Sequence, residues 1–283
     1  MKSITAVSNA KINLSLDVLG SRSDGYHEVK MIMQSIPLSD EITVEISDGE
    51  GIEILCAHEG VPEDGRNIAY KAASLFLERT GNLAHIKITI DKTIPVAAGM
   101  AGGSTNAAAV LKSLNTLFDS PLSEKELLAL GLKVGADVPF CLMGGCAISE
   151  GIGEILTPIK PLSGAFIVVA KPDFSVSTKW VYSNFIPERI EKHPDTEKVR
   201  DAIAKGNIYE IAKYTANVLE SVTESKYPVI AEYKKIMSEN GAILSMMSGS
   251  GPSVFGIFDD KAKAQKTYSL MKDINNETFI IEI

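Results

Sequence analysis

One segment, PVAAGMAGGSTNAAAVLKSLN from Pro95 to Asn115, constrains the fold more than any other part of the chain. Gly99, Gly102 and Gly103 precede an alanine-rich run, and Ser104 or Thr105 stands where a helix N-cap is expected. Helical spacing gives that run one apolar face, made of Ala107, Leu111, Leu114 and Phe118. Glycines let backbone N–H groups approach a ligand, and the first turn of a helix carries roughly +0.5 charge. We therefore predict a strand-to-helix turn that can bind phosphate.

The turn matches neither of the two common nucleotide-binding patterns. No lysine follows its second glycine as in a Walker loop, and the dinucleotide pattern G-x-G-x-x-G is missing. A tight turn that serves backbone geometry alone explains the same residues. Other parts of the chain must decide between these interpretations.

Composition narrows the class of protein. The chain has 283 residues, 45% of them hydrophobic, and a formal net charge of −8 without a basic run. These values favour a globular protein and argue against partners such as nucleic acid or anionic membranes. The sequence has only three cysteines, and no apolar stretch approaches the ~18 residues of a membrane helix. We expect a cytoplasmic protein, and no histidine or cysteine spacing indicates a structural metal site.

The length of the chain favours two domains, and its hydrophobic periodicity indicates mixed α and β structure. Alternating apolar residues predict a half-buried strand over 10–18, and further strands over 29–36, 41–47 and 85–94, in a mostly antiparallel sheet. Helices are predicted after Asn67, after the Ser123 capping box, and over 197–206, 208–222, 228–241 and 261–274. The apolar strand in PLSGAFIVVAKP follows the best candidate boundary, which divides the chain into domains 1–157 and 158–283.

Two further segments have open interpretations. The small residues of LSMMSGSGPSVFGIF, from Ser248 to Pro252, form either a plain hairpin turn or a loop that lies against a ligand. Asp137 precedes Pro139 and is either the N-cap of a short helix or a catalytic carboxylate.

Five segments taken together resemble the GHMP family of small-molecule kinases: AKINLSLDVLGSRSDGYHEV, PVAAGMAGGSTNAA, GADVPFCLMGGCAISEG, KPDFSVSTKWVY and MSGSGPSVF. They occur in the right order from Ala10 to Phe255. The resemblance implies an α+β, two-domain GHMP kinase fold. Its N-terminal ATP-binding domain is of the ribosomal-protein-S5-domain-2-like type, its C-terminal α/β domain is ferredoxin-like, and the active site lies in the cleft between them.

The resemblance also implies site residues. Lys11 and Asp137 match the catalytic positions, as electrostatic partner and as base for the acceptor hydroxyl. The residues that match the ATP-binding positions are Asn67, Pro95, Ala97, Ala98, Gly99, Met100, Ala101, Gly102, Gly103, Ser104 and Thr105. ATP and Mg²⁺ are the implied cofactors, and Ser104 or Thr105 could contact the metal, whose ligands are otherwise unknown. Ala101 stands where many members carry glycine, which narrows the freedom of the loop.

Within the family, the segments are most similar to members that phosphorylate the 2-hydroxyl of a cytidine diphosphate-linked methylerythritol, in the non-mevalonate isoprenoid route. The residues that match their substrate-binding positions are Asn13, Tyr26, His27, Thr178 and Tyr182. Aromatic rings suit a cytosine because it offers two flat faces. Two alternatives stay open: a GHMP kinase for another small alcohol, and a nucleotide-binding regulator without turnover.

Overall fold

The computed structural model describes residues 2–283, which divide into two compact units. Unit 1 comprises the chain up to Ala10, Leu38–Val96 and Ala101–Gly144, and unit 2 comprises Lys11–Pro37, Ala97–Met100 and Gly145–Ile283. The expected domain limits, 1–157 and 158–283, stay a prediction. Among residues 2–283, no helix combines the length and the apolar character needed to cross a membrane.

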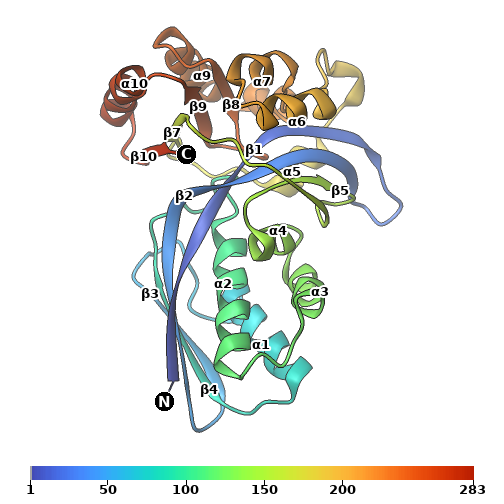
Figure 1. Ribbon diagram of the computed structural model, residues 1–283, viewed down its shortest axis with the longest axis vertical. Coiled ribbons are helices and arrows are strands. Elements are labelled where there is room, and N and C mark those ends of the chain that lie inside the picture. The colour runs from blue at the N-terminus through green and yellow to red at the C-terminus, as the bar shows by residue number, and fades with distance from the viewer. Residues whose placement is uncertain (1) are drawn as a thin grey trace. The chain divides into compact units, whose positions relative to one another are not determined.

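Unit 1 packs helices on one sheet. Its elements are β3 (Gly51–Cys56), β4 (His85–Asp91), α1 (Ile68–Thr80), α2 (Gly102–Leu117), α3 (Glu124–Val134) and α4 (Val138–Met143), with parts of β1 (Lys2–Ser21) and β2 (His27–Ser47). Glu41–Ser47 of β2 pairs antiparallel with β4, and β4 pairs parallel with β3. The helices α1 and α2 lie side by side (Figure 1).

The core of unit 1 forms where the predicted apolar faces meet. Phe76 of α1, Leu111 and Leu114 of α2, and Ile86 and Ile88 of β4 are fully buried in one cluster. Each such side chain stabilises the fold by about 1.5–3 kcal/mol relative to exposure. The core therefore fixes α2, whose first turn follows the glycine-rich segment.

Unit 2 contains a four-stranded sheet and most of the helices. Its elements are β5 (Cys146–Glu150), β6 (Ile155–Ile159), β7 (Phe166–Ala170), α5 (Thr178–Ser183), the 3-10 helix η1 (Pro187–Arg189), α6 (Thr196–Ala204), α7 (Ile208–Tyr214), α8 (Glu220–Lys226), α9 (Val229–Glu239), β8 (Leu244–Met247), β9 (Val254–Phe258), α10 (Lys261–Ile274) and β10 (Thr278–Glu282). Separately, Met31–Gln34 of β2 pairs antiparallel with β5, and β5 with β6.

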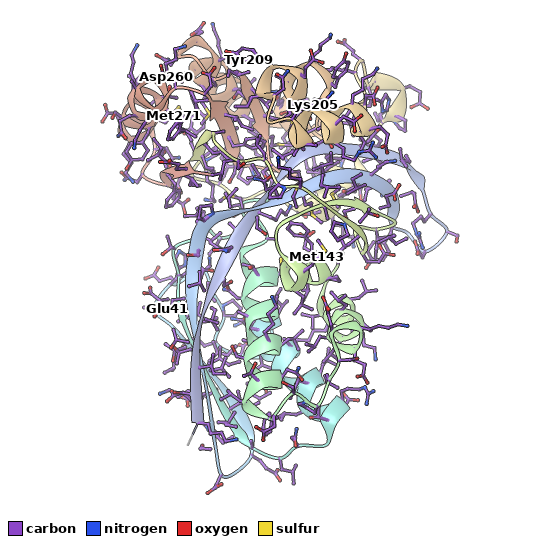
Figure 2. All side chains as sticks on the ribbon, viewed as in Figure 1. Glu41, Met143, Lys205, Tyr209, Asp260 and Met271 are labelled. Carbon is purple, nitrogen blue, oxygen red and sulfur yellow. The ribbon has the colours of Figure 1, made fainter. Side chains whose placement is uncertain are left out.

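The four-stranded sheet has the order β10-β7-β9-β8, with every pair antiparallel. Two crossovers with helices connect these strands, which is the βαββαβ pattern of a ferredoxin-like domain. The helices of unit 2 bury some side chains and expose others: Met271 on α10 is fully buried, whereas Lys205 and Tyr209 are exposed (Figure 2). The predicted ferredoxin-like sheet is confirmed.

Several predicted elements differ from the structure. The strands predicted over 29–36 and 41–47 are one continuous strand, β2. The helix predicted over 208–222 is two helices, α7 and α8, because the chain is extended at Thr215 between them.

The prediction of a half-buried strand is wrong for the middle of β1. Every residue from Ala10 to Val18 is buried, the polar ones included. Lys11, Asn13 and Asp17 have side-chain hydrogen-bond partners there, as Asp17 Oδ1 has in His193 Nδ1 at 2.7 Å, whereas the buried hydroxyl of Ser15 has none among the described residues. Alternation thus gives the two faces of the strand but not their exposure.

Candidate functional site

The first turn of α2 has open backbone donors. The helix begins at Gly102, earlier than predicted, and neither Ser104 nor Thr105 is its N-cap. The N-cap position is Ala101, which has a left-handed backbone (φ 58°) and makes no capping bond with its side chain. Without a side-chain cap, the first amides of α2 and the helix dipole remain available to an anion.

The hydroxyls of the first turn differ in their environment. Thr105 is buried, and its Oγ1 donates to the carbonyl of Asn9 at 2.8 Å. Ser104 is half-buried, and no residue that the structure describes is bonded to its hydroxyl. Ser104 is therefore the hydroxyl that can meet a phosphate or a cation.

A buried ion pair holds the segment that leads into the glycine-rich turn. Lys92 Nζ lies 2.9 Å from Asp40 Oδ2, and the two side chains are 5% and 0% exposed. Asp40 Oδ1 also accepts from the backbone N–H groups of Thr93 and Ile94, at 2.8 and 2.7 Å. A Cβ at Gly102 would lie 3.2 Å from both Lys92 Nζ and Ile94, so this pair leaves little space for a side chain there.

Gly99 lies in unit 2 against the loop that follows β8. Its backbone is left-handed (φ 72°), and an added Cβ would lie 2.2 Å from the carbonyl oxygen of Ser248. Ser248 Oγ donates to Gly99 O at 3.0 Å. The loop after β8 is a buried hairpin turn packed on Gly99, so the hairpin interpretation is confirmed. Contact of this loop with a ligand stays a prediction.

Lys11 and Asn13 occupy neighbouring positions on one face of β1. Both are buried, and Lys11 Nζ donates to Asn13 Oδ1 at 2.7 Å. The Asn13 amide in turn donates to Met31 Sδ at 3.1 Å. Since Asn13 is neutral, its bond to Lys11 does not balance the ammonium charge, and a buried charge is costly unless it is paired. Lys11 is thus suited to an anionic partner.

Asp137 stands at the N-cap position of α4, with Pro139 in the first turn. The N-cap interpretation is confirmed for the backbone position, but the side chain makes no capping hydrogen bond. The carboxylate is half-buried and is not used to begin the helix. It remains available as a proton acceptor.

Asn67 uses its side chain to begin α1. Its Oδ1 accepts from Ala69 N at 2.9 Å, and its Nδ2 donates to Pro62 O at 2.8 Å. The expected role of Asn67 in ATP binding stays a prediction.

The turn before β2 presents an exposed aromatic ring. Arg22 bonds to Asp24 and Glu28, and Asp24 Oδ1 accepts from the N–H of Tyr26 at 3.1 Å. Tyr26 is 57% exposed, whereas buried tyrosine is common in a core. The turn therefore holds Tyr26 in a position open to a flat ligand.

Three predicted substrate residues come together in unit 2. The rings of His27 and Tyr182 have centroids 5.1 Å apart with a tilt of 36°. Thr178 begins the same helix as Tyr182, and its Oγ1 lies 2.9 Å from Ser250 Oγ. Thr178 thus joins α5 to the loop that packs on Gly99.

Sequence reasoning missed the aromatic residues that hold α5. Phe174 stacks on Tyr227 with centroids 4.6 Å apart, and Trp180 meets Tyr227 edge-on at 6.4 Å. Lys226 Nζ lies 4.0 Å above the Trp180 ring, a cation–π contact. Phe174 and Trp180 belong to the quoted segment KPDFSVSTKWVY, so their proximity to Thr178 in sequence was the available signal.

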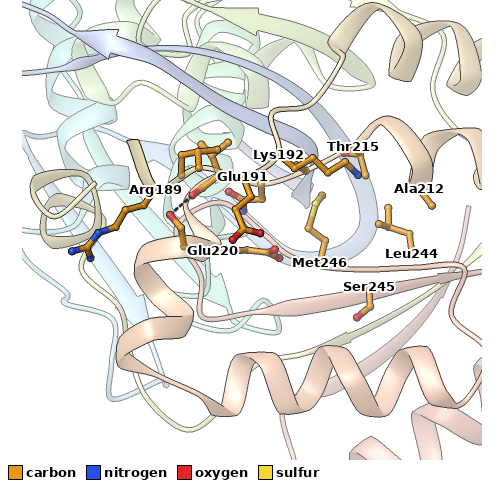
Figure 3. A pocket seen from close by; sticks show the side chains of 14 residues that line it. Arg189, Glu191, Lys192, Ala212, Thr215, Glu220, Leu244, Ser245 and Met246 are labelled. Atoms are coloured by element: carbon orange, nitrogen blue, oxygen red, sulfur yellow. Dashed lines mark hydrogen bonds between the residues drawn. The ribbon is translucent and has the colours of Figure 1, made fainter. Parts of the chain in front are cut away.

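A pocket of about 550 Å³ opens beside the edge strand β8 (Figure 3). None of the predicted site residues lines it; its lining includes Thr215, Asn217, Glu220 and Met246. Burial raises the pKa of Glu220, although Lys234 Nζ at 2.7 Å opposes that effect. Glu220 also accepts a hydrogen bond from the backbone N–H of Met247 at 2.7 Å.

The first turn of α2 supplies only part of a ligand set for a Mg²⁺ ion bound to phosphate. Within residues 2–283, no three His, Cys, Asp or Glu side chains gather as a metal-binding group. A hydroxyl with phosphate oxygens and water is a suitable hard ligand set for Mg²⁺. Ser104 is the side chain that fits such a set.

The sequence matches the GHMP kinases N terminal domain over residues 67–145 and the GHMP kinases C terminal domain over residues 199–273. The chain belongs to the GHMP kinases, and the predicted family and two-domain fold are confirmed. Similar curated relatives carry a more specific name, "4-diphosphocytidyl-2-C-methyl-D-erythritol kinase". The relative from Clostridium botulinum is 52% identical over 96% of this chain and 97% of its own, and that from Acetivibrio thermocellus is 51% identical over 100% and 99%.

Solved structures agree with the sequence comparison. A crystal structure of 4-(cytidine 5'-diphospho)-2C-methyl-D-erythritol kinase has a TM-score of 0.84 and 32% identity, covering 98% of each chain. A homoserine kinase from Cytophaga hutchinsonii, 21% identical, has a TM-score of 0.78 and covers 100% of this chain and 96% of its own. The second likeness concerns the fold alone.

Proposed function

We propose that the protein transfers the γ-phosphoryl group of ATP to the 2-hydroxyl of 4-diphosphocytidyl-2-C-methyl-D-erythritol, a step of the non-mevalonate isoprenoid route. The observation that carries this proposal is identity of about half the residues with relatives that bear this kinase's name, along almost the whole chain. Phosphoryl transfer needs hydrogen-bond donors that hold the phosphates, a proton acceptor and a cation. The residues described above offer all three.

ATP phosphates would bind at the first turn of α2 and the preceding loop. The uncapped amides after Ala101 and the left-handed residues Ala97 and Gly99 support this, because such backbone can wrap an anion closely. Mg²⁺, when bound, neutralises charge on the phosphates, and Ser104 is the hydroxyl that would hold it.

Asp137 would accept the proton of the substrate's 2-hydroxyl. The oxygen of that hydroxyl would then bond to the γ-phosphorus of ATP, and the bond from this phosphorus to ADP would break. The free, half-buried carboxylate of Asp137 supports this role. Lys11 would stabilise the negative charge at the reacting oxygens, and Asn13 fixes its ammonium at 2.7 Å.

The cytidine end would bind to the aromatic residues of unit 2. The exposed Tyr26 and the neighbouring rings of His27 and Tyr182 support stacking on a cytosine, and Thr178 supplies a hydroxyl beside them. Free cysteines and the need for ATP support a cytoplasmic location.

The test measures ADP release with ATP, Mg²⁺ and the cytidyl substrate, beside mevalonate and homoserine as competing alcohols. Release with the cytidyl substrate is expected. Release only with another alcohol would reassign the substrate, and ATP binding without release would favour the regulator.

Two matched variants then test the proposed base. Asp137→Asn should lower kcat by about 10²–10⁴-fold while ATP still binds. Asp119→Asn removes a carboxylate that is 91% exposed and should leave kcat unchanged. Equal rates for the two variants would remove Asp137 from its role.

A further inference from the structure

The break between α7 and α8 places Asn217 beside β1. Leu16 N–H donates to Ala216 O at 2.9 Å, and Val218 N–H donates to Leu16 O at 3.0 Å. These two backbone bonds form an isolated parallel bridge between Leu16 and Asn217, and Thr215 Oγ1 adds a separate bond to Leu14 O. The bridge lies on the strand that carries Lys11 and Asn13.

Asn217 fastens the loop after β8. Its side chain is buried, and Nδ2 donates to Met247 O at 2.8 Å and to Gly249 O at 2.7 Å. Its Oδ1 accepts from Leu219 N at 3.0 Å, just before α8. Thr223 of α8 adds a bond to Ser250 O at 3.2 Å. One buried amide thus holds two carbonyls of the loop.

The loop after β8 lies in close backbone contact with Gly99. A Cβ at Gly249 would lie 3.2 Å from Gly99 O, and one at Gly99 would overlap Ser248 O. Ser248 Oγ bonds to Gly99 O. Since the two backbones are in direct contact, a shift of the loop displaces Gly99.

We infer that Asn217 is a positioning residue for ATP binding: it fixes the Ser248–Ser250 loop, and that loop fixes Gly99. The inference rests on the proposed function of the Gly99 segment. Asn217 would act through the loop, because its side-chain amide is bonded to Met247 O and Gly249 O. Asn217 also lines the pocket beside β8.

The test compares Asn217→Asp with Asn217→Ala. Aspartate has the same shape and keeps an acceptor for Leu219 N, but it places an oxygen against the carbonyls of Met247 and Gly249. Both variants should raise the KM for ATP about tenfold, as expected when buried carbonyls lose their donor. A residue that only caps α8 would behave differently, because aspartate would then restore the wild-type KM.

The matched control is Asn240→Asp. Its Nδ2 donates to Ile236 O at 2.8 Å at the end of α9, a single carbonyl outside the loop. This control should lower the urea midpoint and leave the KM for ATP unchanged.

Direct ATP binding, measured by calorimetry, separates this inference from the proposed function. Wild-type protein that binds no ATP would refute the proposed function, whereas equal binding by wild type and a folded Asn217→Asp variant would overturn the role of Asn217. If that variant does not fold, Asn217→Ala decides by the same measurement, since it also removes the donor to Met247 O and Gly249 O. Equal ATP binding by wild type and folded Asn217→Ala would likewise overturn the inference.

Discussion

Replacing Gly99 with alanine tests the packing between the glycine-rich segment and the loop after β8. The new Cβ would lie 2.2 Å from Ser248 O and 3.1 Å from Gly251 O, both backbone atoms. No side-chain rotation relieves such contacts, so the two backbones must separate by about 1 Å. Overpacking of this kind costs about 1–3 kcal/mol. The left-handed backbone at Gly99 adds about 1–2 kcal/mol for any residue with a Cβ.

The expected loss in the free energy of unfolding is therefore about 2–5 kcal/mol, out of the roughly 5–15 kcal/mol that is typical of proteins. Gly81→Ala is the matched control. Gly81 has a similar φ of 70°, but no atom lies within 4 Å of the position that a Cβ would take there. It should lose only the backbone contribution of about 1–2 kcal/mol.

Urea unfolding followed by circular dichroism measures both losses, and steady-state kinetics measures the KM for ATP. Gly99→Ala should lose more stability than Gly81→Ala and should raise the KM for ATP, which Gly81→Ala should not change. Equal losses with an unchanged KM would refute the packing argument.

Two further predictions concern backbone strain and burial. Ala101 has a φ of 58°, so Ala101→Gly should stabilise the fold by about 1 kcal/mol and raise Tm by about 2–4 °C in a thermal scan; a lower Tm would contradict this. Burial raises the pKa of Cys146 to about 12, so its thiol stays protonated at neutral pH and should react with a thiol reagent far more slowly than the half-buried Cys56. Modification of Cys146 in the native protein as fast as that of Cys56 would be inconsistent with the fold.

Much of the fold follows from local sequence. Asn67 caps α1 and Gly81 ends it in the left-handed conformation, as predicted from their residue types. Ser123 and Glu126 form the expected capping box before α3. These features involve neighbours within a few residues, so the local sequence suffices to predict them.

Contacts between distant segments could not be predicted in the same way. The pattern of 208–222 is helical, yet the chain breaks at Thr215 because Leu14 and Leu16 of β1 bond to this stretch. The start of α2 differs from the prediction for a similar reason: Thr105, a suitable cap by type, instead gives its hydroxyl to Asn9. In both places a distant backbone group outweighs local propensity.

The sequence by itself determined the family, the ferredoxin-like sheet and the residue types that a phosphate and a cytosine require. Only the tertiary structure decided that Lys11 is buried beside Asn13, that Gly99 contacts Ser248, and that Asn217 holds the loop after β8. The physical reason is the separation in sequence over which each interaction acts. Periodicity and caps are properties of adjacent residues, whereas burial and close backbone contact arise only when segments far apart in the chain pack together.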